Sequence, residues 1–477
     1  MPAWPIFPLI AAVAILVSPT AHSETISQAL VSAYRANPEL NGQRARVRAT
    51  DENIGRANAD YRPQVSATLD AGFQYSDVRA ASPATEPGSV TDSMGEGTTR
   101  SVSGVARYTG RPRGVGLNAR QTLFDGNRTF NSVRQAESQV LSAREVMRVT
   151  EQNVLFSAAS NYMNVLRDTA ILNLRRNNVA VLLEQVRQTR DRRDAGDVTQ
   201  TDLAQATAAL AQARSDVYAA QADLQASIAG FRQVAGREPR RLSPAQSLEH
   251  LLPRRLQDAI SISQVEHPAI AAALHDADAA ALAVKISEGV LYPTVTLNGA
   301  VSRRADFEGI PHYRAFTASI LGRVDIPLYR GGDEYASIRQ AKEQVSQARL
   351  NADLQRDQVR AALVTAWGLL QAAKAQIASG QAAVAAAELA LYGIREEALV
   401  GQRTTFDVLT AQRNLLNARV NVVIAQRDRV VGSYSVLAAI GRLNAFVLAL
   451  AVETYDPAIH FEQVKGKLFG VRTSDGQ

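Results

Sequence analysis

A run of about 68 residues, 128–195, contains neither proline nor glycine. Heptad repeats of apolar residues continue through this run, with Val133, Val140, Met147 and Val154 following one another at seven-residue spacing. At 1.5 Å per residue such a helix would extend about 100 Å, whereas helices of globular proteins average roughly 11–12 residues. The run therefore predicts a long coiled-coil helix that does not belong to a compact domain.

The sequence also contains an internal duplication. Pro63 corresponds to Pro293 at an offset of 230 residues, and residues 123–136 correspond to 328–341 at an offset of 205. Because the two offsets differ by 25 residues, the first copy must hold one longer loop before residue 123. A duplication of this extent predicts a repeated structural unit rather than a series of unrelated domains.

Each copy shows the same order of expected elements. A helical stretch, 24–61 or 256–291, ends near a proline, which removes a backbone donor and stops a helix. Two runs of about ten residues follow, in which apolar and polar residues alternate as in strands with one apolar face. Loops at 77–113 and 302–314 separate the two strands of each copy. A long helix and a return helix of roughly half its length complete the copy.

The domain boundaries follow from this order. Residues 24–241 and 256–445 form the two repeats, with a linker at 242–255 and a C-terminal tail at 446–477. Residues 1–23 contain a short apolar core followed by small residues, which is typical of a secretory signal peptide, although no Lys or Arg precedes the core. A buried N-terminal helix is the alternative for this segment. No later stretch is apolar enough for a transmembrane helix.

The expected strands have the right length to cross a bilayer at a tilt. A transmembrane sheet must close, and single-chain barrels begin at about eight strands. Four strands per chain therefore require an oligomer, and three copies would supply twelve. The expected fold class is α+β, with a closed transmembrane β-barrel made of strands from several copies of the chain and long coiled-coil helices outside it. The polar strand faces carry Asp70, Arg120, Arg323 and Asp325, which are candidates for lining the barrel lumen and tuning its ion selectivity. A solvated wall without such a role is the favoured interpretation.

Composition excludes several other classes. The 477 residues contain no Cys, which rules out disulfides, zinc–thiolate sites, iron–sulfur clusters and thiol nucleophiles. A net charge of +6 without a long basic block gives no support for nucleic-acid binding. The sequence has no metalloprotease helix motif, no phosphate-binding glycine loop before a helix and no defensible catalytic triad. We therefore expect neither an enzyme nor a metal or cofactor site.

The ordered duplicate resembles the TolC family of outer-membrane channel proteins over about residues 24–445. The resemblance is carried by the helix–proline–strand junctions at 61–63 and 291–293 and by the strand-to-helix turns at 123–126 and 326–332. The Phe-Asp-Gly-Asn-Arg-Thr form of the first turn is similar to the type I secretion branch. The resemblance implies a homotrimer in the outer membrane of a Gram-negative bacterium. Its fold would be a trimeric twelve-stranded outer-membrane β-barrel, continuous with a long periplasmic α-helical coiled-coil tunnel.

The function that the resemblance implies is the exit duct of a tripartite export system for proteins or small molecules. A periplasmic adaptor protein and an inner-membrane transporter, either ABC-type or proton-driven, would be its partners, besides the lipid of the outer membrane. Type I protein secretion is favoured over multidrug efflux. Two alternatives belong to other classes: a periplasmic coiled-coil scaffold or adaptor without a pore, and an autonomous porin.

The resemblance also assigns roles to residues. The turns between long and return helices, 196–202 and 401–407, would form the periplasmic entrance of the tunnel. The family carries an acid at the position of Asp407, where three copies form a ring that lines the constriction. Asp202 and Arg403 match two partners in polar links that close this tip. Three carboxylates around a narrow pore would favour cations.

The same turns have an ordinary structural interpretation. Gly196 and Gly401 are typical left-handed helix ends. Thr199 and Thr404 each precede an acid by three residues, which is the capping-box pattern. Asp407 is therefore either a pore residue or a helix cap, and we favour the pore.

Overall fold

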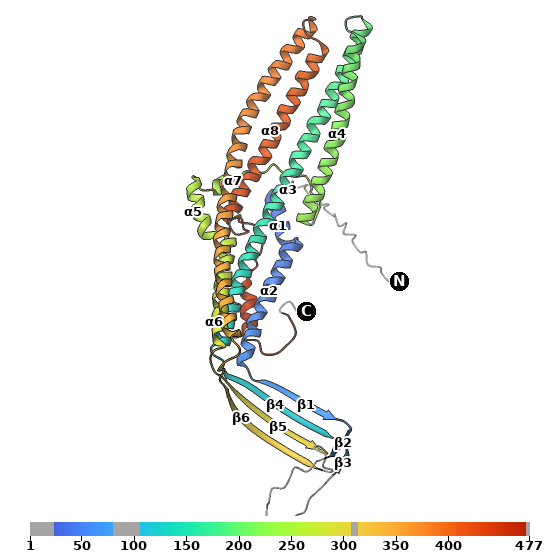
Figure 1. Cartoon of the computed structure of the whole chain (residues 1–477). Coiled ribbons are helices and arrows are strands. Elements are labelled where there is room, and N and C mark those ends of the chain that lie inside the picture. Colours follow the sequence, from blue (N-terminus) through green and yellow to red (C-terminus); the bar gives the residue numbers. More distant parts are fainter. Residues whose placement is uncertain (1–22, 80–104, 307–312, 474–477) are drawn as a thin grey trace, which may run out of the picture. The chain divides into compact units, whose positions relative to one another are not determined.

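The computed structural model describes residues 23–79, 105–306 and 313–473. Both repeats contain the same six elements, and the long and return helices have equal lengths in the two copies, 67 and 36 residues (Figure 1). The first repeat consists of α1 (Ile26–Ala36), α2 (Pro38–Asn58), β1 (Gln64–Ala71), β4 (Arg113–Phe124), α3 (Arg128–Asp194) and α4 (Gln200–Ala235). The second consists of α5 (Leu256–Glu266), α6 (Pro268–Gly289), β5 (Thr294–Ala305), β6 (Arg314–Asp325), α7 (Asp333–Leu399) and α8 (Thr405–Ile440).

Shorter elements fall outside this plan. β2 (Gln74–Arg79) pairs with β3 (Val105–Gly110) in a separate two-stranded sheet, within the extra length expected in the first copy. A 3-10 turn, Ala59–Tyr61, follows α2, and a second, Glu249–Leu251, lies in the linker. The C-terminal tail contains one further helix, α9 (Pro457–Lys465).

The expectation of one helical stretch before each pair of strands is wrong. Each stretch is two helices, because Pro38 and Pro268 occupy the first positions of α2 and α6. The preceding residues, Asn37 and His267, have ψ of 123° and 121°, which is extended backbone. A residue before proline is driven out of the helical region by the proline ring, so the helix restarts there.

The expected loops are shorter in the structure. β2 and β3 occupy part of 77–113, while β5 continues to Ala305 and β6 begins at Arg314. Arg303 and Arg304 therefore belong to a strand rather than to a loop. The central parts of both loops and nearly all of the expected signal peptide lie outside the described residues.

The four long strands form one antiparallel sheet in the order β1-β4-β5-β6 (Figure 1). Because side chains alternate along a strand, the register gives one polar face and one apolar face. The apolar face is exposed in a single chain, with Leu69 84% and Ile320 79% accessible. We define this apolar face by its large and small apolar residues: Val65, Ala67, Leu69, Val115, Leu117, Ala119, Leu297, Val301, Phe316, Ala318, Ile320 and Val324.

Packing divides the chain into two compact units, and each takes segments from both repeats. The first unit consists of Met1–Arg44, Glu145–Ala271 and Gln355–Tyr455. The second consists of Ala45–Arg144, Ala272–Leu354 and Asp456–Gln477.

The core of the first unit joins α1, α3, α4 and α8. Its largest fully buried side chains include Tyr162, Phe231 and Leu437. The Tyr162 hydroxyl lies 2.8 Å from the carbonyl oxygen of Glu24 and 2.6 Å from that of Ser243. These contacts hold the start of the first repeat and the linker against α3.

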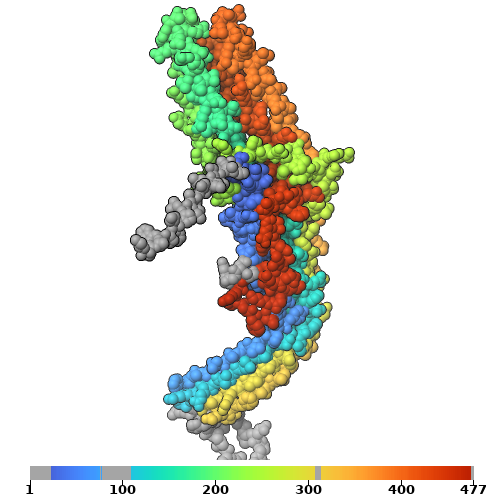
Figure 2. Space-filling view, turned by 180° about the vertical axis from the view of Figure 1, so that it is seen from behind, coloured from blue at the N-terminus to red at the C-terminus, as the bar shows by residue number. Residues whose placement is uncertain are grey.

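In the second unit, α9 packs against α2 and α3. Phe461 contacts a small core that includes Ile54 and Val140. His460 Nδ1 lies 2.9 Å from Oδ2 of the fully buried Asp51. Figure 2 shows the C-terminal residues, in red, covering this part of the helices. The tail is therefore anchored to the second unit by both apolar packing and a buried polar contact.

α7 leaves a long apolar surface open in a single chain. Among the described helices, it is the one that is long and apolar enough to cross a membrane by length and composition, and little of that stretch is buried. This differs from the expectation that no such stretch exists. Residues 371–390 are alanine-rich, and small residues allow helices to approach one another closely in a coiled coil.

Candidate functional site

The turn between α3 and α4 carries the first group of expected site residues. Gly196 adopts φ of 87°, the left-handed conformation that ends a helix. The backbone N–H of Asp202 donates to Thr199 Oγ1 at 3.2 Å, and the backbone N–H of Thr199 donates to Asp202 Oδ2 at 3.0 Å. The expected capping box is therefore present at the start of α4.

The turn between α7 and α8 repeats this geometry. Gly401 has φ of 77°. The backbone N–H of Asp407 donates to Thr404 Oγ1 at 3.2 Å, and that of Thr404 donates to Asp407 Oδ2 at 3.0 Å. Asp407 is thus a capping residue of α8, which is the ordinary interpretation of its position.

The cap keeps the Asp407 carboxylate ionised. Its pKa lies below the ordinary value of 3.8, because the backbone N–H and the hydroxyl of Thr404 donate to the charged form and Arg403 adds a favourable charge. Both hydrogen bonds from Thr404 end on Oδ2. The carboxylate is therefore a fixed negative charge whose other oxygen is not used by the cap.

The turns of the two repeats lie together within the first unit. The pKa of Asp202 is lowered by the hydroxyl and backbone N–H of Thr199 and by the hydroxyl of Thr405, which belongs to the other turn. Leu409 of α8 packs against the small core around Leu210 of α4. A single chain therefore places the carboxylates of Asp202 and Asp407 at the same end of its helices.

Within the described residues, Arg403 hydrogen-bonds to Glu397 rather than to Asp202. Its Nε donates to Glu397 Oε2 at 2.7 Å. Sequence reasoning missed Glu397, because an acid in the last turn of a helix opposes the macrodipole and belongs to no capping motif. The one sequence feature that could have indicated a role for Glu397 is Arg403, a basic residue six positions later. The expected link between turns of neighbouring copies stays a prediction.

The four charged residues expected in the lumen all lie on the polar face of the sheet, but they do not form one group. Asp70 aligns with Gly114 near the strand ends that are distant from the helices. Arg120, Arg323 and Asp325 lie nearer the ends that join the helices. Arg323 Nε is 3.8 Å from Asp325 Oδ1 and both side chains are mostly exposed, so this pair contributes little to stability.

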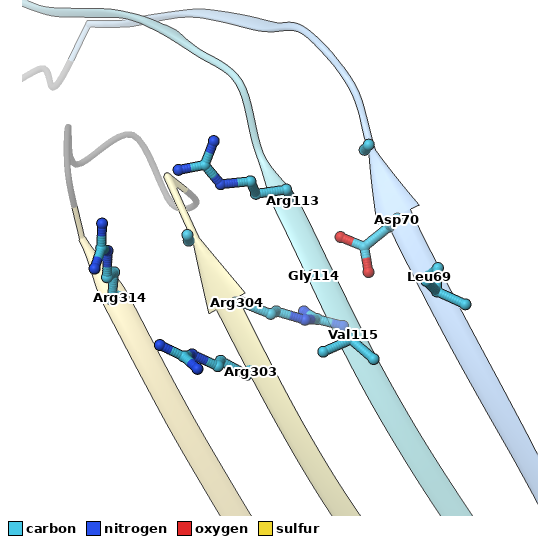
Figure 3. Close-up of a pocket in the computed structure, with 10 residues that line it drawn as sticks. Leu69, Asp70, Arg113, Gly114, Val115, Arg303, Arg304 and Arg314 are labelled. Atoms are coloured by element: carbon cyan, nitrogen blue, oxygen red, sulfur yellow. The ribbon is translucent and has the colours of Figure 1, made fainter.

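Gly114 brings Asp70 and Arg304 toward each other across β4. A Cβ atom at Gly114 would lie 2.8 Å from Asp70 Oδ1 and 3.1 Å from Arg304 Cγ, so a side chain there would displace both (Figure 3). Sequence reasoning missed Arg304 because the expected second loop began at residue 302. Continuing the alternation of β5 for two more pairs of residues would have found it.

Comparisons with known proteins agree with this arrangement. The family model described as outer membrane efflux protein matches residues 29–237 and 259–442. The outer membrane efflux protein BepC of Brucella suis is 41% identical over 463 residues, which span 97% of this chain and 95% of the relative. The outer membrane protein TolC of Vibrio cholerae is 24% identical over 339 residues, 69% of this chain and 77% of the relative.

Two further matches extend the comparison. The proteases secretion protein PrtF of Dickeya chrysanthemi is 26% identical over 311 residues, 64% of this chain and 67% of the relative. The crystal structure of the CmeC outer membrane channel of Campylobacter jejuni has a TM-score of 0.73 at 15% identity and covers 92% of this chain and 89% of that chain. At this identity the structural likeness shows the fold alone.

The fold, the two capped turns and these matches define an outer-membrane channel protein. The chain belongs to the outer membrane efflux protein family, and its resemblance to the TolC family is confirmed. Family members are channels rather than enzymes. Among the residues that the structure describes, no group of three or more His, Asp or Glu is placed to hold a metal ion.

Proposed function

We propose that this chain is the outer-membrane exit duct of a tripartite export system and works as a homotrimer. The observation that carries the proposal is the open four-stranded sheet. Within the part of the chain that the structure describes, β1 and β6 each have a partner strand on one side only. An open edge inside a bilayer leaves backbone groups unpaired at a cost of several kcal/mol each. Three copies of four strands close a twelve-stranded barrel, which exceeds the minimum of about eight strands.

The helices support the same assembly. The alanine-rich surface of α7 is long, apolar and largely uncovered in a single chain. Close packing against α3 or α7 of neighbouring copies would bury it and enclose a tunnel. A monomeric periplasmic scaffold would leave this surface and the apolar face of the sheet in water.

Asp407 is proposed to serve both as a cap and as a member of an acidic ring. The cap fixes the position and the charge of the carboxylate, while the Thr404 hydrogen bonds occupy Oδ2 alone. Three such charges around one axis would raise the local concentration of cations at the entrance. Arg403 and Asp202 are proposed to link neighbouring turns when the tip is closed.

Efflux is the activity that we propose first, because the relative with 41% identity over 97% of this chain is named an efflux protein. Type I protein secretion is the second candidate. It is supported by the Phe-Asp-Gly-Asn-Arg-Thr turn and by similarity to a protease secretion protein. Either activity requires a periplasmic adaptor and an inner-membrane transporter, ABC-type or proton-driven.

A gene deletion and complementation separates the two candidates. Efflux predicts that the deletion strain accumulates an amphiphilic dye such as ethidium and that its set of secreted proteins is unchanged. Secretion predicts loss of a protein from the medium with normal dye accumulation.

The mass of the detergent-extracted protein tests the assembly. The full chain has a mass of 51.4 kDa, and removal of a signal peptide lowers it slightly. The proposal predicts an outer-membrane particle of three chains. A monomer recovered from the soluble periplasmic fraction would instead support the scaffold alternative.

A further inference from the structure

Three arginines stand on the apolar face at one end of the sheet, where the alternation predicts apolar residues. The register places Arg113 and Arg314 in the outermost row, and it places Arg303 in the next row between Val115 and Phe316. These two rows are the farthest along the strands from the helices. Figure 3 shows the three arginines grouped at the strand ends.

The distribution of charge on this face is one-sided. Within the described part of the four-stranded sheet, the apolar face carries no charged side chain besides these three arginines. At the end that joins the helices, Arg120 and Arg323 lie on the opposite, polar face. In the proposed barrel both ends of the sheet reach a headgroup region, and only the end distant from the helices presents arginines to it.

The guanidinium groups are available to a ligand. The side chains of Arg303 and Arg314 are exposed, and within the described residues neither guanidinium forms a hydrogen bond or an ion pair. Arg113 approaches Asp306 at 3.7 Å and is still 63% exposed. Asp70 lies in the row of Gly114 and Arg304 on the polar face, so its carboxylate is on the other side of the sheet from the three arginines.

The position of these arginines restricts the ligand. An arginine on the lipid face costs about 2–4 kcal/mol at the bilayer midplane and about 0–1 kcal/mol near the interface, so this end of the sheet lies at headgroup depth. A guanidinium binds phosphate oxygens with two parallel hydrogen bonds. Arg303 and Arg314 also line a groove whose apolar wall consists of Val115, Leu117, Val301 and Phe316.

We propose that Arg113, Arg303 and Arg314 bind the phosphate groups of the lipopolysaccharide of the outer leaflet, with one of its acyl chains in the adjacent groove. The inference rests on the proposed barrel, in which the apolar face contacts lipid and the end distant from the helices reaches the cell exterior. Phosphorylated glycolipid occupies that leaflet alone. The described sheet has no lipid-facing arginine at its other end, so the proposed site belongs to one leaflet alone.

Lipid A is the probe that tests the proposal. Native mass spectrometry would count the lipid molecules bound to the purified oligomer. The two ligands compared are bisphosphorylated lipid A and lipid A with both phosphates removed. A third measurement adds free pyrophosphate as a competitor of the phosphorylated lipid. We expect about tenfold or greater preference for the phosphorylated lipid, because several charge-assisted hydrogen bonds are involved. Pyrophosphate should compete weakly, since it lacks the acyl chains that fill the groove.

Two neighbouring residues of β5 provide matched variants. Arg303→Gln, alone or with Arg314→Gln, should lower lipid A affinity about tenfold or more, whereas Arg304→Gln, on the other face, should change it by less than about twofold. Equal binding of dephosphorylated lipid A by the wild type would overturn the inference, and so would an equal loss in Arg304→Gln. Complete displacement by pyrophosphate would also overturn it, because the site would then bind phosphate rather than lipid.

Conductance measured on the same preparations separates this inference from the proposed function. Channels that conduct but show no phosphate dependence in lipid A binding would refute the lipid site alone. A wild-type protein that forms no oligomer and no channel would refute the barrel on which the site depends.

Discussion

Arg403 donates a hydrogen bond to Glu397 across the α7–α8 turn, with 2.7 Å between Nε and Oε2. The two side chains are 50% and 44% exposed, so solvent screens the pair and it exchanges readily with other partners. This guanidinium is the one that the family resemblance assigns to a closing link at the tip. The intrachain pair and a link to a neighbouring turn therefore compete for one arginine.

Opposite effects on gating should follow from changing either partner. Arg403→Gln removes the closing link and should raise the open probability of single channels. Glu397→Gln frees Arg403 for the link to Asp202 of a neighbouring turn and should lower the open probability. Recordings in planar bilayers measure both, and a shift in the same direction for the two variants would contradict the competition.

The selectivity of the entrance should be insensitive to mild acid. The pKa of Asp407 is lowered by the hydrogen bonds from Thr404, so the carboxylate keeps its charge above its ordinary value of 3.8 and loses it only as pH falls further. Block by a trivalent cation should therefore persist to about pH 4 and weaken below it. Loss of the block between pH 6 and 5 would point to a different titrating group.

The linker contributes stability that depends on pH. Glu249 accepts hydrogen bonds from Lys374 at 2.9 Å and from Arg429 at 2.7 Å. Burial alone would raise the pKa of Glu249, but these partners and Ser247 outweigh it and lower the pKa to about 2. Because the folded pKa is depressed, the stabilisation is complete above the ordinary value of 4.5 and is lost as pH falls toward 2.

Glu249→Gln should therefore lower the thermal midpoint at pH 7 and leave it nearly unchanged near pH 2. At pH 7 the free energy of unfolding should fall by roughly 1 kcal/mol, a value that allows for solvent screening of these partly exposed groups. Glu388→Gln is a matched control, because Glu388 pairs with Arg419 at a similar distance but is about half exposed. An equal loss in both variants would show that burial does not strengthen the linker contacts.

The anchoring of α9 should depend on His460. His460→Ala leaves Asp51 buried without its partner, and breaking a buried polar pair from one side is strongly destabilising. Trypsin should then remove the tail at Lys465 or Lys467 faster than in the wild type, as mass spectrometry would show. His250→Ala changes an exposed histidine and should leave the cleavage rate unaltered.

Regular patterns in the sequence were sufficient to predict the long helices, the paired strands and both capped turns. The proline-free run 128–195 became α3, and Thr199 and Thr404 became N-caps as their spacing predicts. These features depend on local periodicity, which a single sequence displays. The apolar residues of the strands were found for the same reason.

Features that depend on long-range packing were not predictable. Glu397 is defined by the turn that brings Arg403 back to it, and α9 is defined by the surface of α2 and α3 on which it packs. The sequence predicts a loop at Arg303 and Arg304, although both belong to β5. Arginine at position 303, on the apolar face, contradicts the alternation that identifies a strand. The departure from the pattern is also what indicates a lipid-headgroup site.

Single-channel conductance of the purified oligomer in a planar bilayer tests the central claim most directly. We predict small, cation-selective currents that a trivalent cation blocks, with the block lost in Asp407→Ala. Large currents that are indifferent to Asp407→Ala would favour an open porin in which Asp407 is only a helix cap. No conductance from well-folded protein would contradict the account and support a scaffold without a pore.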